Sequence, residues 1–248
     1  MSGNIAPNIV TDGLVLCLDG ANLYSYPTSG TLWSDLTANR NNFTLINGTT
    51  YDSSNGGSLL FDGINDYANI TYNPSLSSVS GITLESWFYP VGRGTNAIFD
   101  GAGTLMRAGQ VEDMQYALNY VWDFNSLTFG TFRSNSGNPY PSAGSFYFYG
   151  TPNNVVYRNR WNLATVTRTN NDVKIYANGQ LVLSLNNVPI SSNTYWITFL
   201  GGSLMLGRSI NNLINYNGKI AITRIYNRGL SDSEVLQNFN AHKGRFNL

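Results

Sequence analysis

The clearest alternation of apolar and polar residues lies between positions 161 and 185. Residues 161–168, WNLATVTR, have the two-residue period of a strand, and the Asn-Asn-Asp at 170–172 follows as a turn. The alternation continues over 173–177 and then meets Asn178-Gly179, which favours a two-residue hairpin because both positions tolerate positive φ. Leu181, Leu183 and Leu185 resume the pattern on the far side. This stretch predicts a three-stranded antiparallel meander.

Short runs of the same kind recur along the chain, separated by Gly, Asn, Asp and Ser. They include GLVLCLD at 13–19, YANITY at 67–72, ITLESWFYP at 82–90, QYALNYVW at 115–122, SFYFYG at 145–150 and KIAITRIYN at 219–227. Many short strands with such turn residues between them indicate a sandwich or barrel and not βαβ units.

One segment near the end of the chain has the pattern of a helix. Ser231 and Glu234 have the spacing of a capping box, in which each side chain accepts a hydrogen bond from the other residue's backbone N–H. Apolar residues at 235, 236 and 239 form a stripe, and Gly244 follows as a stop. The sequence thus predicts one short C-terminal helix beside the last strand.

In this order, the segments resemble the laminin-G-like, or concanavalin A-like, jelly-roll family. The blocks that carry the resemblance are LLFDGINDYANI at 59–70, ITLESWFYP, the meander at 161–182, and the closing strand and helix at 216–239. The resemblance implies an all-β fold, a two-sheet antiparallel jelly-roll sandwich with one short C-terminal helix. We expect an N-terminal arm at 1–12 and a single domain over 13–248, with long loops in 101–160.

Composition narrows the range of partners. Of the 248 residues 42% are hydrophobic, enough for a substantial core, while 11% are charged, with 14 basic and 14 acidic side chains. A neutral chain without a Lys/Arg cluster has no electrostatic footprint for nucleic acid. The sequence has no apolar run of membrane-spanning length and no secretory signal pattern. Cys17, the single cysteine, lies in an apolar run and is expected to be a buried thiol.

The segment Asp62-Gly63-Ile64-Asn65-Asp66 separates two β-type runs, and two interpretations stay open. Asx side chains and Gly are typical of a tight corner. Asn65 and Asp66 are also candidate ligands, with Asp66 a candidate for calcium, which needs several oxygen ligands. No cofactor is required on either interpretation, and calcium is the one candidate.

The calcium interpretation rests partly on a distant similarity to pentraxins, in which an acidic residue of this loop helps hold calcium. That family has a second, acid-rich loop, which here reads Arg208-Ser-Ile-Asn211-Asn212 and carries no carboxylate. Asn211 is the ligand candidate of this loop. Asp19 in LDGAN is a second metal candidate, because relatives sometimes have a structural ion there.

Neutral sugars are bound by stacked aromatic rings with amide and hydroxyl partners, and the predicted loops contain both. The ligand candidates are Trp122 in VWDFNS and Tyr140 in NPYPS, together with Phe124, Tyr195 and Trp196. The alternative for each ring is packing in the core or against another subunit, since a sandwich of this size buries many aromatics.

Catalysis lacks the residues it needs. His242 is the single histidine and lies at the end of the predicted helix, where we expect a surface position far from any nucleophile. The glutamates are Glu85, Glu112 and Glu234, and the clustered Glu-x-Asp-x-x-Glu strand of glucanases on this fold is missing. On the strand at 82–90, Glu85 has Thr83 and Trp87 as same-face neighbours and no second carboxylate. The sequence predicts a protein that is not an enzyme.

The closing block NRGLSDSEVLQNF is similar to domains met in tailed-phage virion proteins. This similarity implies a non-enzymatic virion structural protein, as a capsid decoration, fibre or tail appendage. Its expected partners are other virion proteins and a host-surface glycan, with a homo-oligomer such as a trimer compatible with that role. A calcium-assisted glycan-binding lectin is the alternative, and a glycan hydrolase is the third hypothesis.

Overall fold

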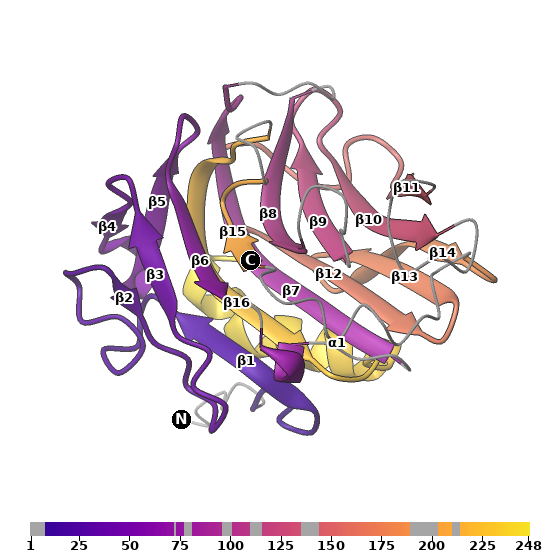
Figure 1. Ribbon diagram of the computed structural model, residues 1–248, viewed down its shortest axis with the longest axis horizontal. Coiled ribbons are helices and arrows are strands. Elements are labelled where there is room, and N and C mark those ends of the chain that lie inside the picture. Colours follow the sequence, from indigo (N-terminus) through magenta and orange to yellow (C-terminus); the bar gives the residue numbers. More distant parts are fainter. Residues whose placement is uncertain are drawn as a thin grey trace.

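The computed structural model describes residues 8–71, 73–76, 81–95, 101–109, 116–134, 144–188, 203–209 and 214–248. These residues form two antiparallel sheets that face each other, with one α-helix on the outside (Figure 1). The architecture is the two-sheet jelly-roll sandwich with a short C-terminal helix that the sequence predicts. Within the described ranges, no helix is long and apolar enough to cross a membrane.

Sheet A has eight strands. From edge to edge they are β14 (Gln180–Leu185), β13 (Asp172–Ala177), β12 (Asn162–Thr169), β7 (Gly81–Gly92), β16 (Asn217–Tyr226), β5 (Ser58–Asp62) and β4 (Thr50–Asp52), with β1 (Leu14–Asp19) also paired to β16.

Sheet B also has eight strands. In order they are β11 (Gly144–Gly150), β10 (Ser126–Ser134), β9 (Tyr116–Val121), β8 (Ala102–Ala108), β15 (Ser203–Leu206), β6 (Tyr67–Thr71), β3 (Phe43–Ile46) and β2 (Leu32–Trp33). Residues 101–160, where we expect long loops, thus contribute four strands to this sheet. Short 3₁₀ helices occur at η1 (Ser54–Gly56), η2 (Pro74–Leu76) and η6 (Lys243–Phe246).

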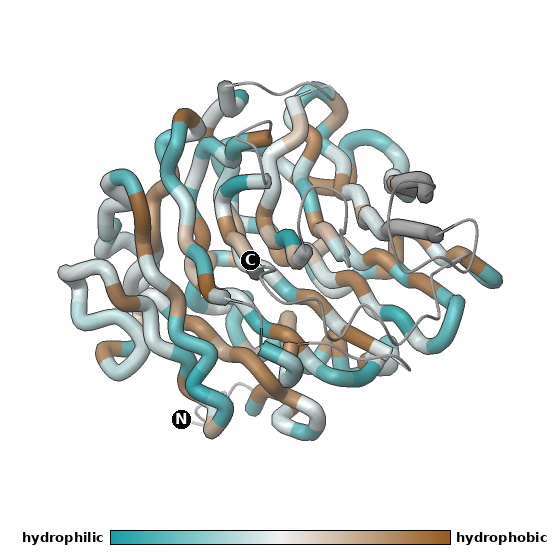
Figure 2. The backbone as a smooth tube through the Cα atoms, viewed as in Figure 1, coloured by the Kyte–Doolittle hydropathy of each residue, from teal (hydrophilic) through white to brown (hydrophobic). Residues whose placement is uncertain are grey.

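Strand β7 shows how the alternation builds two different buried layers. Leu84 and Phe88 point into the large hydrophobic cluster between the sheets. Glu85 and Trp87 point the other way, where Trp87 packs with Phe246 in a separate cluster. Figure 2 shows hydrophobic and hydrophilic stretches following one another along the backbone of the strands. Both faces of β7 are therefore covered, one by sheet B and the other by the C-terminal segment.

The predicted meander is present as β12, β13 and β14, with Val166 opposite Ile175 in the ladder. Asn178 and Gly179 both have positive φ, as the hairpin turn requires. The register shifts between Ile175 and Tyr176 against β14, so the alternation expected over 181–185 is not kept. Leu183 and Leu185 pack on the core, but Leu181 remains 45% exposed.

The predicted helix is α1 (Asp232–His242), and its capping box between Ser231 and Glu234 is complete. It lies on the outer face of sheet A, where Phe239 stacks on Trp87 at 5.8 Å between ring centroids. The α-helix ends at His242, two residues before the expected stop at Gly244, and the chain continues as η6. The left-handed residue that ends η6 is Asn247.

The part of the N-terminal arm within the described ranges packs against this helix. Val10 donates its N–H to Asn238 Oδ1 at 2.8 Å, and its carbonyl accepts from the Tyr226 hydroxyl at 3.0 Å. Cys17 on β1 is buried and free, as expected from its apolar run.

Candidate functional site

The segment 62–66 is a hydrogen-bonded corner between β5 and β6. Asp62 Oδ1 accepts from the backbone N–H groups of Ile64, Asn65 and Asp66 at 2.7, 3.2 and 3.4 Å. Asp66 Oδ2 in turn accepts from the N–H of Asp62 at 3.1 Å. Gly63 has φ of +75°, and a Cβ there would lie 2.5 Å from Asn217 Cβ. The corner interpretation of these residues is confirmed.

Asp66 is buried in this corner, and its second oxygen, Oδ1, has no partner within the described residues. Burial raises the pKa of Asp66; the nearby Asp62 carboxylate also raises it, while the hydrogen bond from the Asp62 N–H opposes the shift. Asn65 is exposed at the tip, and its carbonyl accepts from Asn47 Nδ2 at 2.9 Å. Asn211 lies outside the described residues.

The two metal candidates lie in different settings. Asp19 Oδ1 accepts from the Ala21 N–H at 2.9 Å and pairs with Arg245 Nη1 at 2.8 Å, so a cation of the protein already balances its charge. At the corner, one unpartnered carboxylate oxygen does not match the six to eight oxygen ligands that calcium takes. Within the described ranges no three His, Cys, Asp or Glu side chains gather to hold a metal. Calcium binding remains a prediction.

Of the five aromatic candidates, Trp122 and Phe124 lie within the described residues, and Phe124 is 41% exposed. Tyr140, Tyr195 and Trp196 lie outside them. Arg158 covers the Trp122 ring, with its guanidinium carbon 4.4 Å from the ring centroid. The same guanidinium donates to the Trp122 carbonyl and, at 2.9 Å, to Asn125 Oδ1. Arg158 thus occupies the ring face that a sugar would need, and it ties the segment before β12 to the turn between β9 and β10.

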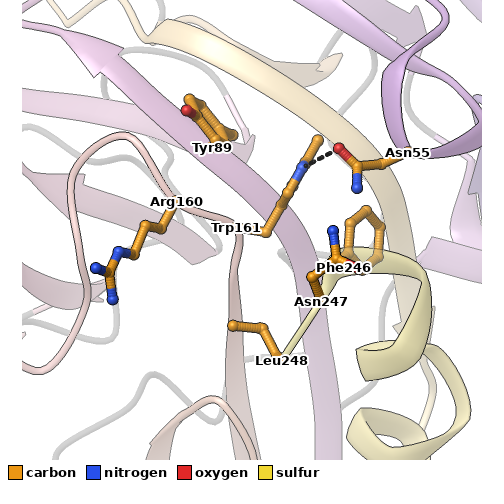
Figure 3. A pocket seen from close by; sticks show the side chains of 7 residues that line it. All are labelled: Asn55, Tyr89, Arg160, Trp161, Phe246, Asn247 and Leu248. Carbon is orange, nitrogen blue, oxygen red and sulfur yellow. Dashed lines mark hydrogen bonds between the residues drawn. The ribbon is translucent and has the colours of Figure 1, made fainter.

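The structure reveals a hollow of about 360 Å³ that the sequence did not identify (Figure 3). Its walls come from four places in the chain: η1, β7, the segment leading into β12, and the C-terminal residues after α1. The lining residues are Asn55, Tyr89, Arg160, Trp161, Phe246, Asn247 and Leu248. The hollow lies on the α1 side of sheet A, because Trp161 and Phe246 belong to the cluster around Trp87.

Hydrogen bonds hold two walls of the hollow together. Trp161 Nε1 donates to Asn55 Oδ1 at 3.0 Å (Figure 3). Asn55 Nδ2 donates to the Arg245 carbonyl at 3.0 Å, and Arg245 Nε donates to the Asn55 carbonyl at 2.7 Å. The indole N–H and the Asn55 side-chain amide are therefore satisfied within the protein.

The aromatic side chains form one continuous surface. The Trp161 ring lies edge-on to Tyr89 with centroids 5.5 Å apart, and tilted against Phe246 at 4.6 Å. Trp161 is 5% exposed, whereas Tyr89 is half-buried. Lys219 Nζ lies 5.2 Å from the Tyr89 ring centroid and pairs with Asp52. An apolar surface with a few polar groups at its edge is typical of small-ligand sites.

The residues considered above for catalysis, Glu85 and His242, belong to a second cluster of polar side chains, between sheet A and α1. Glu85 Oε2 pairs with Arg224 Nη1 at 3.3 Å across β7 and β16, and Asn238 Nδ2 donates to both Glu85 oxygens at 3.1 and 3.0 Å. As predicted, Glu85 has no second carboxylate beside it on its strand. Instead it has a cation, which the alternation pattern could not reveal.

His242 is not the surface residue that we expect from the sequence. Its ring nitrogens lie 3.1 and 3.3 Å from Arg224 Nη2, and the side chain is half-buried. Burial, with the charges of Arg224 and Arg245, lowers the pKa of His242 to about 4. The imidazole is therefore neutral at pH 7 and packs against the Glu85–Arg224 pair.

A family model described as the concanavalin A-like lectin/glucanases superfamily (Laminin_G_3) matches residues 61–236. No curated protein matches the chain. The family match therefore covers most of the sandwich, including the corner at 62–66, β7, Trp161 and the start of α1.

Solved structures with the same fold come from several classes of binding domain. The binding domain of Paraclostridial Mosquitocidal Protein 1 is 17% identical with a TM-score of 0.66, over 92% of this chain and 52% of that one. The binding domain of Botulinum Neurotoxin DC in complex with SialylT is 14% identical with a TM-score of 0.65, over 93% and 52%. Domain 4 of AbnA, an extracellular arabinanase from Geobacillus stearothermophilus, in complex with arabinotriose, is 19% identical with a TM-score of 0.63, over 91% and 97%. The chain spans about half the length of the toxin domains.

Proposed function

Since the chain belongs to the concanavalin A-like lectin/glucanases superfamily, we propose that it is a non-enzymatic module that binds a glycan in the hollow of Tyr89 and Trp161. The observation that carries this proposal is the hollow itself, in which a half-buried tyrosine and a tryptophan edge line one open space with amide and guanidinium groups. Aromatic rings bind the apolar face of a sugar, and the polar groups at the rim hydrogen-bond its hydroxyls.

The residues of the hollow support binding and not hydrolysis. A glycosidase of the usual kind needs two carboxyl groups on either side of the scissile bond. None of the described residues that line the hollow is an Asp or a Glu. Glu85 is enclosed under α1 by Arg224 and Asn238, where a polysaccharide has no access.

The proposal agrees with what two of the structural relatives are described as holding. Domain 4 of the arabinanase is in complex with arabinotriose, and the neurotoxin binding domain is in complex with SialylT. At 19% and 14% identity these relatives support the fold and the general use of it for binding. We carry the glycan role to this chain on the strength of its own hollow.

We further propose that the module is displayed on a phage particle, where glycan binding would serve host recognition. The support is the similarity of the closing block at 227–239 to domains of tailed-phage virion proteins. Proteomic analysis of purified particles should find the chain, and its absence from mature particles would reject this location.

A glycan array with the purified chain tests the binding proposal. We expect at least one glycan class to bind in both calcium and EDTA, because the hollow needs no metal. Tyr89→Leu should weaken that binding about tenfold or more, since it removes a ring of the contact surface. Tyr24→Leu, at a 90% exposed aromatic outside the hollow, is the matched control and should bind as the parent does.

If no glycan on the array binds, the hollow is rejected as a glycan site. The same holds if Tyr89→Leu binds as tightly as the parent. Binding that EDTA abolishes would favour the calcium-assisted lectin in its place.

A further inference from the structure

The cationic side chains near the hollow differ in whether they form an ion pair. Lys219 pairs with Asp52, and Arg245 pairs with Asp19 at 2.8 Å, so both of these cations are balanced. Arg160 is exposed at the rim and makes no ion pair within the described residues. Among the described side chains that line the hollow, Arg160 is therefore the one that carries a charge, and that charge is positive.

Arg160 supplies the rim with hydrogen-bond donors. Both ends of the Asn55 side-chain amide are already hydrogen-bonded, one to Trp161 and the other to the Arg245 carbonyl. The guanidinium of Arg160 has no acceptor function, and its planar set of N–H groups matches a carboxylate. Its carbon lies 5.9 Å from the Tyr157 ring centroid, a contact that leaves the N–H groups available.

The backbone under Arg160 is held in place on both sides. Asn162 Nδ2 donates to the Arg160 carbonyl at 2.8 Å, and the Asn159 N–H donates to the Pro90 carbonyl at 2.9 Å. Arg158 anchors the same segment on Trp122. The guanidinium thus extends from a fixed base, which reduces the entropy lost when it binds a ligand.

We propose, on the basis of the glycan-binding function above, that the hollow selects a sugar that carries a carboxylate. Figure 3 shows Tyr89 and Trp161 between Arg160 on one side and Phe246 with Asn247 on the other, with the Arg160 guanidinium turned outward from Trp161. A sugar ring set against Tyr89 and Trp161 places its acidic group at Arg160. Uronic acids and sialic acids share this chemistry.

Matched pairs of sugars provide the test, with affinities measured by titration calorimetry on the full chain. One pair is cellobiouronic acid and cellobiose, and the other is sialyllactose and lactose. We expect the acidic member of one pair to bind about tenfold or more tightly than its neutral partner, the range of a charge-assisted hydrogen bond. The pair that shows this preference identifies the type of acid. Raising salt from about 0.05 M to about 0.5 M should reduce the preference, because the contact is solvent-exposed.

Arg160→Gln should bring the ratio of acidic to neutral affinity close to one. Arg40→Gln is the matched control, because Arg40 is also exposed and does not line the hollow, and it should keep the ratio of the parent. Equal affinity for both members of each pair would overturn the acidic preference and leave the glycan proposal standing. An acidic preference that survives in Arg160→Gln would also overturn it. Failure of every sugar to bind would reject both proposals together.

Discussion

Glu85 and Asp66 are both buried carboxylates of one sandwich, and their surroundings differ sharply. Glu85 accepts from Arg224, from Asn238 through both of its oxygens, and from Thr165 Oγ1 at 3.5 Å. Asp66 accepts one backbone N–H from Asp62, and its Oδ1 has no partner within the described residues. Glu85 is thus surrounded by a cation and hydrogen-bond donors, whereas one oxygen of Asp66 has no such partner among the described residues.

The difference shows how the fold handles a charge taken out of water. A buried ion is tolerated when a counter-ion and hydrogen bonds replace its hydration. Arg224 and Asn238 do this for Glu85, and the pair links the outer face of sheet A to α1. Burial raises the pKa of both carboxyls, but Arg224 and Asn238 oppose the shift at Glu85, whereas one backbone N–H opposes it at Asp66 and the Asp62 carboxylate adds to it. The two residues should therefore respond in opposite ways when their charge is disturbed.

The largest effect is expected from Arg224→Met. This change leaves Glu85 as a buried charge without its cation, and it should lower the free energy of unfolding by about 3–5 kcal/mol. Urea unfolding at pH 7 gives the value. The double variant Glu85→Gln/Arg224→Met removes the stranded charge and should recover part of the loss. A cost below about 1 kcal/mol for Arg224→Met would contradict the importance of the pair.

A smaller effect should follow from acidifying His242, which packs on the same pair. Its native pKa of about 4 lies below the unfolded value of 6.5, so the unfolded chain takes up a proton first as the pH falls. Stability is therefore full above pH 6.5 and is lost as the pH falls from 6.5 to about 4. The loss should be about 2–3 kcal/mol.

His242→Gln isolates this imidazole from the other titrating groups. Across the same pH window, the free energy of unfolding of the parent should fall by this amount, whereas that of the variant should not show this loss. Parallel curves for the two proteins would mean that His242 does not titrate as its contacts with Arg224 indicate.

Local pattern was enough to predict much of the fold. The alternation over 161–177, the Asn178-Gly179 turn and the Ser231–Glu234 capping box each depend on residues close together in sequence, and each is present. The corner at 62–66 belongs to the same class, since Asp62 bonds the N–H groups of the next few residues. The strand expected over 181–185 is present, but its alternation fails at Leu181 because of a register shift, which no short pattern announces.

The hollow and the network under α1 could not be predicted in this way, because their parts lie far apart in the chain. Trp161 meets Asn55 across 106 positions, and Asn238 meets Glu85 across 153. The sequence indicated Trp122 as a candidate sugar-binding ring, but Arg158, from 36 positions away, lies over one face of it. One signal was available: Trp161 opens the most regular strand, and residues at strand ends often line surface sites.

The smallest effect is expected at Asp66, and its direction is opposite to that at Arg224. Because the native pKa of Asp66 is raised, its charge costs stability as the pH rises through that pKa, and nothing is lost below the unfolded value of 3.8. Asp66→Asn should therefore keep or raise the free energy of unfolding at pH 7 and match the parent below pH 3.8. Urea unfolding at both pH values, each with millimolar calcium and with EDTA, separates a structural corner from a metal site. We expect calcium to leave the parent unchanged, since Asp66 Oδ1 is the one unpartnered carboxylate oxygen among the described residues of the corner. If calcium stabilises the parent and Asp66→Asn abolishes that gain, the corner binds a metal, with Asp66 as one of its ligands.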